Sequence, residues 1–274
     1  MSNIPYNKLT KEDKLNIIST YYDTKFNQYS FKRMANLCNV SNRAFSRVLV
    51  ESGINTKLKN RYIIKNEDYF KNINNENKAY FLGLLFADGY IGNENQIILT
   101  LKDKGNTRDI LNKFIFDLES NIKIDTVKPS CGYKTTNNFL KISFSNKTIN
   151  TSLKNLGLGN HKETSRYFIP DEIIKNNLQS HFIRGLYDGD GSLSIKNKHM
   201  ITPQRTISFL GGNSLLLQIK QIFIDELGVN DNKIRKSPNS DKISELRFSG
   251  NKQVERIKEY LYKNSHIYLD FKKF

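Results

Sequence analysis

The sequence has little cysteine, little histidine and no long hydrophobic run. Its two cysteines, Cys38 and Cys131, do not form a C-x-x-C pair, and none of the four histidines is near either of them, so the usual pattern of a zinc site is absent. No apolar stretch approaches the roughly 18–20 residues that a membrane-spanning helix needs, and the N-terminus lacks the apolar core of a signal peptide. We therefore expect an intracellular protein without a membrane segment.

Acidic residues are also in deficit. The 274 residues include 27 Asp and Glu against 43 Lys and Arg, which gives a formal net charge of +16. A protein with this balance favours a polyanionic partner. Charge alone leaves RNA, DNA and an anionic membrane surface open.

Two familiar catalytic or nucleotide-binding patterns are missing. No serine or cysteine stands with a histidine and an acid in a recognisable nucleophilic frame. The pair Gly211-Gly212 precedes a predicted helix at residues 213–227, but two glycines do not make a phosphate-binding loop. The sequence therefore gives no support to nucleophilic serine or cysteine catalysis.

One pattern, an apolar run that ends in Asp-Gly, occurs twice. The two stretches are FLGLLFADGY at residues 81–90 and IRGLYDGDGS at residues 183–192, and their acids, Asp88 and Asp190, are 102 positions apart. Read as helices, both have two small residues at i and i+4, which share one helix face. These pairs are Gly83 with Ala87, and Gly185 with Gly189. Because a glycine inside a helix costs about 1 kcal/mol relative to alanine, we expect two helices that cross with their backbones nearly in contact.

The two acids close the predicted helices, with Gly89 and Gly191 expected as left-handed C-caps. A carboxylate in the last turn faces the negative end of the helix dipole, which costs roughly 0.3–1 kcal/mol. The same cost in both copies suggests a compensating cation. If the helices cross through their small faces, Asp88 and Asp190 meet at one end of the crossing. Two carboxylates at that position would make a suitable binding site for a hard divalent ion, which prefers oxygen ligands.

The paired stretches resemble the two motifs of single-chain LAGLIDADG homing endonucleases. The resemblance implies an α+β fold in which the motif helices form the interface of two pseudo-symmetric αββαββα repeats. It also implies that the last acid of each motif, Asp88 and Asp190, binds the catalytic metal. The first motif departs from the family pattern, because Phe86 stands where an acid is usual, whereas the second motif keeps Asp188. This departure does not affect the two metal-binding acids.

The segment before the first motif predicts three helices. Thr10 with Asp13 forms a capping box at the first, and Ser41 is a good N-cap for the third, at residues 42–51. A short helix, a tight turn and a second helix resemble a helix-turn-helix, whose outward residues would face the major groove of DNA. These residues are Asn42, Arg43, Ser46 and Arg47. A three-helix bundle that serves only protein contacts is the alternative.

The predicted organisation has five parts. They are a small all-α helix-turn-helix domain at residues 1–56, a basic linker at 57–75, the first repeat at 76–160, an inter-repeat linker at 161–179 and the second repeat at 180–274. The basic linker, with a short ordered piece expected around Tyr62 to Phe70, could track along DNA or serve as a solvated spacer. FSNK at residues 144–147 and FSGNK at 248–252 match each other, which extends the duplication beyond the motifs.

Each repeat also predicts strands that alternate between apolar and polar residues, among them residues 96–102 and 139–145 in the first repeat. If helices cover one face of each sheet, the other face carries side chains that suit base edges and phosphates. These are Thr100, Lys102, Lys141 and Ser143 in the first repeat, and Thr206, Ser208, Arg235 and Arg247 in the second. A charged sheet face is usually only solvated, so this prediction depends on the motif pair.

The resemblance implies metal-dependent hydrolysis of one phosphodiester bond on each DNA strand. Asp88 and Asp190 would hold Mg²⁺, with the backbone carbonyls of Ala87 and Gly189 as further ligands. Mn²⁺ is an alternative ion, and Ca²⁺ is expected to support binding without cleavage. Members of the family also place a lysine near each scissile group. By their positions after the closing helix of each repeat, the candidates are Lys162 and Lys272.

The sequence thus predicts a Mg²⁺-dependent homing endonuclease of a mobile genetic element, which binds double-stranded DNA as a monomer and makes a staggered break at a long site. We expect it in the cytoplasm of a bacterial or phage-infected cell, or in an organelle. Two alternatives remain, a non-catalytic DNA-binding regulator of the same fold and an RNA-binding maturase. Retention of both acids disfavours the first. The helix-turn-helix disfavours the second, because the deep, narrow major groove of RNA does not admit a helix.

Overall fold

The computed structural model describes residues 3–24, 31–54, 62–128, 138–159, 168–197, 199, 201–237 and 240–273. The chain divides into two compact units, unit 1 at Met1–Arg61 and unit 2 at Tyr62–Phe274. Each unit has a hydrophobic core of its own. Among the described helices, none combines the length and apolar character that a membrane crossing requires.

Unit 1 is helical. Its elements are η1 (Tyr6–Lys8), α1 (Lys11–Thr24), α2 (Phe31–Leu37) and α3 (Asn42–Glu51). The predicted capping box begins α1, since the Asp13 amide donates to Thr10 Oγ1 (3.1 Å) and the Thr10 amide to Asp13 Oδ2 (2.8 Å). Ser41 caps α3 by accepting from the Ala44 amide at 3.2 Å. Local capping chemistry therefore sets where these helices begin.

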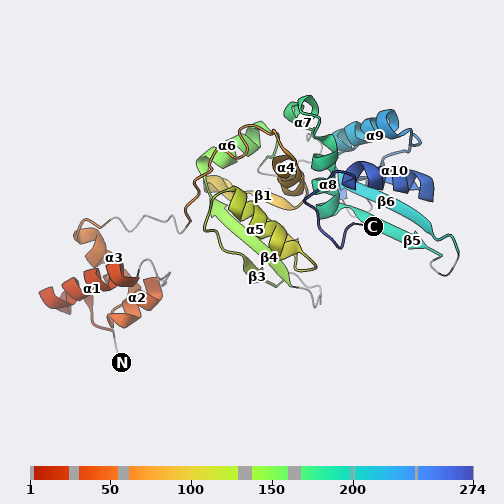
Figure 1. Ribbon diagram of the computed structural model, residues 1–274. Helices are drawn as coiled ribbons and strands as arrows, with labels where there is room; N and C mark the ends of the chain where they lie inside the picture. Colours follow the sequence, from red (N-terminus) through yellow and green to blue (C-terminus); the bar gives the residue numbers. More distant parts are fainter. Residues whose placement is uncertain are drawn as a thin grey trace. The chain divides into compact units, whose positions relative to one another are not determined.

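Unit 2 contains the αββαββα order twice, so the predicted α+β fold of two repeats is confirmed (Figure 1). The first repeat comprises α4 (Glu76–Asp88), β1 (Gly89–Ile91), β2 (Gln96–Lys102), α5 (Thr107–Asp117), β3 (Asp125–Val127), β4 (Phe139–Ser145) and α6 (Lys147–Asn155), with η3 (Asn93–Asn95) before β2. The second comprises α8 (Gln179–Asp190), β5 (Ser192–Lys196), β6 (Gln204–Gly211), α9 (Asn213–Leu227), β7 (Arg235–Ser237), β8 (Ser240–Ser249) and α10 (Asn251–Tyr262), and α7 (Asp171–Lys175) precedes it.

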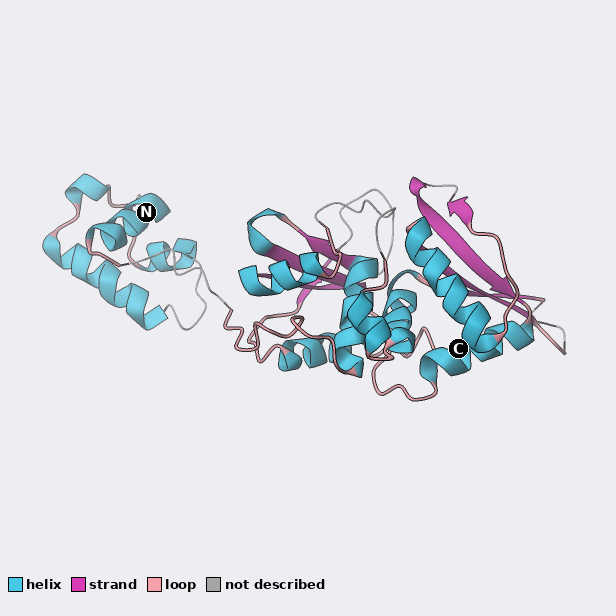
Figure 2. Ribbon diagram, turned by 90° about the horizontal axis from the view of Figure 1, so that it is seen from above, coloured by secondary structure: helices cyan, strands magenta, loops and turns pink. Residues whose placement is uncertain are grey.

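The described strands form two antiparallel four-stranded sheets of the same topology, β1-β2-β4-β3 and β5-β6-β8-β7. Period-two alternation decides which face is buried: Ile97, Leu99 and Leu101 of β2 are at most 3% exposed, while their neighbours face outward. Helices α5, α9 and α10 contact the sheets from the buried side (Figure 2). Among the described helices, none covers the polar face of either sheet.

Helices α4 and α8 lie side by side between the two sheets in both views (Figure 1, Figure 2). Every residue from Ala79 to Ala87 of α4 is buried, as its apolar sequence predicts. The two helices are the shared core of the repeats, and their ends fix where the motif acids lie.

The second half of the predicted linker at residues 57–75 is ordered, as expected around Tyr62 to Phe70, and it packs into unit 2. Tyr69, Phe70 and Ile73 are at most 3% exposed and belong to the core of unit 2. Both aromatic rings pack against Phe114 of α5, at centroid distances of 5.9 and 6.0 Å. Burial of large aromatic side chains anchors this segment to the first repeat instead of leaving it as a spacer.

Gly89 and Gly191 do not adopt the expected left-handed conformation. Their φ angles are −77° and −76°, in the extended region, and the chain passes directly from each motif helix toward a strand. Close packing explains the glycines instead: a methyl group on Gly89 would lie 2.3 Å from the Leu85 carbonyl oxygen, and one on Gly191 would lie 2.2 Å from Cδ2 of Tyr187. Each motif acid consequently stands at a helix–strand junction.

Candidate active site

The crossing of α4 and α8 depends on two glycines. A methyl group on Gly83 would lie 2.1 Å from the carbonyl oxygen of Phe182, and one on Gly185 would lie 2.1 Å from that of Tyr80. No side chain fits at either position without moving a backbone. The predicted crossing through small faces is therefore confirmed, and it explains why each helix tolerates an interior glycine.

The last turns of the two motif helices also touch. A methyl group on Gly189 would lie 2.4 Å from Cβ of Ala87 and 3.0 Å from Oδ2 of Asp88. The Asp88 carboxylate thus lies beside the last turn of α8, which ends at Asp190. Both acids are half-buried. The structure brings the two predicted metal-binding acids to the same end of the crossing.

Lys272, one of the two predicted lysines, reaches this end. Its Nζ donates to the carbonyl oxygens of Gly191 at 2.6 Å and Gly189 at 3.4 Å, which flank Asp190. Burial lowers the pKa of Lys272, and the negative charges of Asp188, Asp88 and Asp190 oppose that shift. The ammonium also faces the negative end of the α8 dipole. The other predicted lysine, Lys162, lies outside the described residues.

A buried arginine lies on α8 about one turn before Asp188. Arg184 is 0% exposed, and its Nε and Nη1 donate to the carbonyl oxygens of Ile267 (2.9 Å) and Leu261 (2.7 Å). Its Nη2 donates to Oε1 of Glu76 at 2.7 Å, at the start of α4. The charge is thus fully hydrogen-bonded, as burial requires. It joins both motif helices to the C-terminal segment.

Asp188 completes this polar layer. It accepts from the hydroxyls of Tyr80 (2.8 Å) and Tyr262 (3.0 Å) and from the Leu269 amide (2.7 Å). Burial raises its pKa to about 6, although these three donors favour the ionised form. Its role is structural because its carboxylate points into the protein.

We did not predict these contacts from the sequence. A usable signal was present, because Arg184 and Asp188 are spaced i, i+4 in the otherwise apolar stretch at residues 182–188 and so share one face. Charged residues at that spacing inside a buried helix indicate a paired, hydrogen-bonded layer. Their partners could not be read from the pattern.

The free face of the first sheet carries the predicted polar residues. Thr100 pairs with Lys141 across β2 and β4, both half-buried, and Lys102 at the end of β2 is exposed. Ser143 is half-buried and accepts from Nε2 of Gln96 at 3.5 Å. These four side chains lie on one face, as the alternation predicts.

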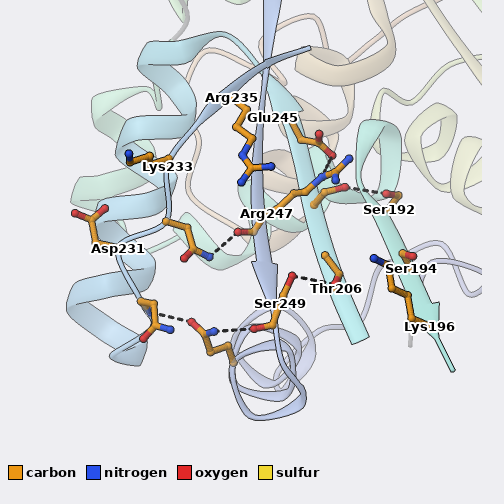
Figure 3. A pocket seen from close by; sticks show the side chains of 14 residues that line it. Ser192, Ser194, Lys196, Thr206, Asp231, Lys233, Arg235, Glu245, Arg247 and Ser249 are labelled. Carbon is orange, nitrogen blue, oxygen red and sulfur yellow. Dashed lines mark hydrogen bonds and ion pairs between the residues drawn. The ribbon is translucent and has the colours of Figure 1, made fainter. Parts of the chain in front are cut away.

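The free face of the second sheet surrounds a polar hollow of about 600 Å³ (Figure 3). Arg235 and Arg247 are exposed there, and Nε of Arg247 lies 2.6 Å from Oε1 of Glu245. This ion pair holds the guanidinium over the sheet. Thr206 is half-buried and shares a 3.0 Å hydrogen bond with Ser249.

Ser208 differs from the prediction of an accessible contact. It is only 6% exposed, and its hydroxyl lies 2.8 Å from that of Ser192 on the neighbouring strand. Its position between β5 and β8 at the centre of the sheet explains the burial. A ligand on this face would meet Ser192 and Arg247 before Ser208.

In unit 1, the predicted groove-facing residues lie on the outer side of α3. Asn42, Arg43 and Arg47 are exposed, and Ser46 is half-buried. Arg47 already has partners: its Nε donates to Glu51 at 2.9 Å, and its guanidinium lies 4.1 Å from the centre of the Tyr6 ring. The outward face of α3 therefore presents two exposed arginines, and one of them, Arg47, is held by Glu51 and Tyr6.

Comparisons with known proteins agree with this architecture. The sequence model of a family described as a LAGLIDADG-like domain matches residues 177–262, which contain α8 to α10. A search of curated protein sequences found no match. Among solved structures, the homing endonuclease I-WcaI bound to its DNA recognition sequence is similar, with a TM-score of 0.51, 15% identity, and coverage of 76% of this chain and 91% of that one.

Two further structures are similar at lower scores. The LAGLIDADG meganuclease I-AabMI bound to uncleaved DNA has a TM-score of 0.47 and 13% identity, covering 73% of this chain and 87% of that one. An I-DmoI variant with its target DNA has a TM-score of 0.43 and 21% identity, covering 70% of this chain and 95% of that one. Residues 177–262 of this chain thus match a LAGLIDADG-like domain, and the two repeats together have the fold of the homing endonuclease I-WcaI.

Proposed function

We propose that the protein is a site-specific homing endonuclease that makes a metal-dependent, staggered double-strand break in DNA. The observation that carries this proposal is the convergence of Asp88 and Asp190 at one end of the α4–α8 crossing, beside Lys272. Each acid belongs to a different repeat, and each repeat has its own polar sheet face. A pseudo-symmetric pair of reactive groups suits a substrate with two strands to cut.

The residues at this end suit a hard divalent cation. In the described residues no group of three or more His, Cys, Asp or Glu side chains is placed to hold a metal. A cation between Asp88 and Asp190 would therefore take its remaining ligands from the backbone carbonyls of Ala87 and Gly189, from water and from DNA phosphate, as Mg²⁺ commonly does. Such an ion supplies positive charge against the scissile phosphate and acidifies water. We expect Mg²⁺ or Mn²⁺ to support cleavage, and Ca²⁺ to support binding alone.

The chain's own residues would then do three things. Asp88 and Asp190, each at the end of a rigid helix, would hold the cation in a fixed position. The Lys272 ammonium offsets negative charge that develops on the phosphate, as Lys162 would at the other centre. The arginines, lysines and hydroxyls of the two sheet faces hold the DNA and read its bases. The net charge of +16 favours association with a polyanion.

Unit 1 would lengthen the recognised site. The exposed residues of α3, Asn42 and Arg43 above all, are placed as the outward face of a recognition helix. Two tethered modules raise each other's effective concentration, so each can bind weakly alone. We propose a monomer that acts on double-stranded DNA inside a bacterial or phage-infected cell or an organelle, as part of a mobile element.

End-capture sequencing tests the proposal. The purified protein is incubated with Mg²⁺ and a complex DNA pool, beside an Asp88→Asn, Asp190→Asn control. Discrete staggered ends that the control lacks would establish the activity and identify the target. No ends, despite tight and salt-sensitive binding of DNA, would overturn it in favour of a DNA-binding regulator. Stronger binding of RNA than of DNA in the same buffer would favour a maturase.

A further inference from the structure

The C-terminal segment at residues 265–273, here called the strap, leaves the second repeat and reaches the first. It follows α10 and is held by hydrogen bonds to its backbone and by buried apolar side chains. Ile267 and Leu269 are at most 2% exposed and belong to the unit 2 core. Beyond Leu269 the chain turns, with the Lys272 amide donating to the Leu269 carbonyl oxygen at 3.0 Å. The contacts that hold residues 268–270 in place therefore set the position of Lys272.

The first repeat supplies one anchor, Asn106. Its Nδ2 donates to the Tyr268 carbonyl oxygen at 2.9 Å, and its Oδ1 accepts from the Asp270 amide at 3.0 Å. Asn106 occupies the N-cap position of α5, where asparagine normally accepts from its own helix, yet it makes no such bond. The Asn106 side chain therefore forms hydrogen bonds with the strap and none with the first turn of its own helix.

The neighbours of Asn106 are shaped for the same contact. Gly105 has φ +54°, which favours glycine, and a methyl group on it would lie 1.9 Å from Oδ1 of Asp270 and would displace that carboxylate. Nζ of Lys104 lies 5.1 Å from the centre of the Phe271 ring. Residues 104–106 thus form a dock for residues 268–271.

The motif helices hold the other side of the strap. Asp188 accepts from the Leu269 amide at 2.7 Å, and Arg184 donates to the Ile267 carbonyl oxygen at 2.9 Å. Glu76 accepts from the His266 amide at 2.7 Å. The strap is therefore fixed by α4, by α8 and by the start of α5.

We propose that Asn106 is a positioning residue that sets Lys272 at the reactive end of α8. This inference depends on the proposed function for its catalytic consequence, but the anchor itself can be tested without cleavage. Among the hydrogen bonds of the described residues, Nζ of Lys272 donates to the carbonyls that flank Asp190 and to neither of those that flank Asp88. Loss of the anchor should therefore slow cleavage of one DNA strand and spare the other.

The experiment compares Asn106→Ala with Asn66→Ala. Asn66 is a matched control in the same unit, since its Nδ2 donates to the Asp117 carbonyl oxygen at 2.8 Å, away from the strap. Single-turnover rates are measured for each strand of the duplex recovered by end capture, at saturating protein. We expect Asn106→Ala to slow one strand about tenfold or more, because small displacements of a reactive group cost rates of this order. Lys272→Met should slow the same strand, and Asn66→Ala should change neither.

Hydrogen exchange supplies a second, activity-free measurement. The amides of Leu269, Asp270 and Lys272 should exchange faster in Asn106→Ala, while those of α4 and α8 keep their wild-type rates. Asn106→Ser replaces the alanine variant if the latter does not fold. Equal slowing of both strands, or wild-type rates on both, would overturn the positioning role. Unchanged exchange in the strap would overturn the anchor, whereas a wild-type protein that cuts no DNA would contradict the proposed function only.

Discussion

Gly185 of α8 packs against Tyr80 of α4 so closely that a methyl group on the glycine would lie 2.1 Å from the tyrosine's carbonyl oxygen. The contact is between backbones, so no rotamer change can relieve an added side chain. The helix crossing that places Asp88 beside the end of α8 depends on this contact and on its counterpart at Gly83.

Gly185→Ala should therefore destabilise unit 2 by about 1–3 kcal/mol, the usual range for overpacking a close-packed interior. Chemical denaturation monitored by circular dichroism measures the change. Gly211→Ala is the control, because a methyl group there would meet its nearest atoms at 3.6 Å, which is ordinary contact. Equal free energies of unfolding for the two variants would contradict the close crossing.

Glu76 makes the fold sensitive to acid. Burial alone would raise its pKa, but hydrogen bonds from the His266 side chain and backbone and the charge of Arg184 outweigh this, so the pKa lies below its ordinary value of 4.5. A carboxylate with a lowered folded-state pKa stabilises the fold above its unfolded pKa, and that contribution is lost as pH falls through the folded-state value. Unit 2 should lose stability below pH 4.5 for this reason.

Glu76→Gln should remove this acid-dependent contribution and, at pH 7, cost about 3 kcal/mol, because it leaves the fully buried Arg184 without its carboxylate. Unfolding curves between pH 3 and pH 7 measure both effects. Glu255→Gln is the control: its surface pair with Arg205 should contribute at most about 1 kcal/mol. An unchanged pH profile in Glu76→Gln would show that another group controls acid unfolding.

Much of the fold could be predicted because its signals are local and occur twice. Strands at Gln96–Lys102 and Phe139–Ser145 and the helix at Asn213–Leu227 have the predicted bounds, since alternation and helical period are visible within each segment. The convergence of Asp88 and Asp190 followed from the duplicated small-residue spacing. Tertiary contacts that join distant residues had no such signal: Glu76 and His266 are 190 positions apart, and nothing near either indicates the other.

Arg247 offers a test of base reading by the second sheet. Its ion pair with Glu245 holds an exposed guanidinium on the free face, where it can donate two hydrogen bonds to a guanine. Arg247→Ala should relax the preference at one base pair of the site, by about 1–3 kcal/mol of discrimination. Cleavage of a library randomised at each position measures this. Arg205→Ala is the control, because Arg205 pairs with Glu255 of α10, and it should leave every preference unchanged.

Removing residues 1–61 should weaken DNA binding and leave cleavage intact. Unit 2 has a separate core, so the shortened protein should fold, and both motif acids and Lys272 remain. The loss of a tethered module should reduce affinity about tenfold or more and lower the dependence of affinity on salt, because fewer phosphates are contacted. Binding titrations across salt concentrations and single-turnover cleavage at saturating protein measure the two effects. Arg43→Ala in the full chain should shift affinity in the same direction by a smaller amount. Equally tight binding by the shortened and full-length proteins would show that unit 1 does not contact DNA, as expected of a helical bundle that serves protein contacts.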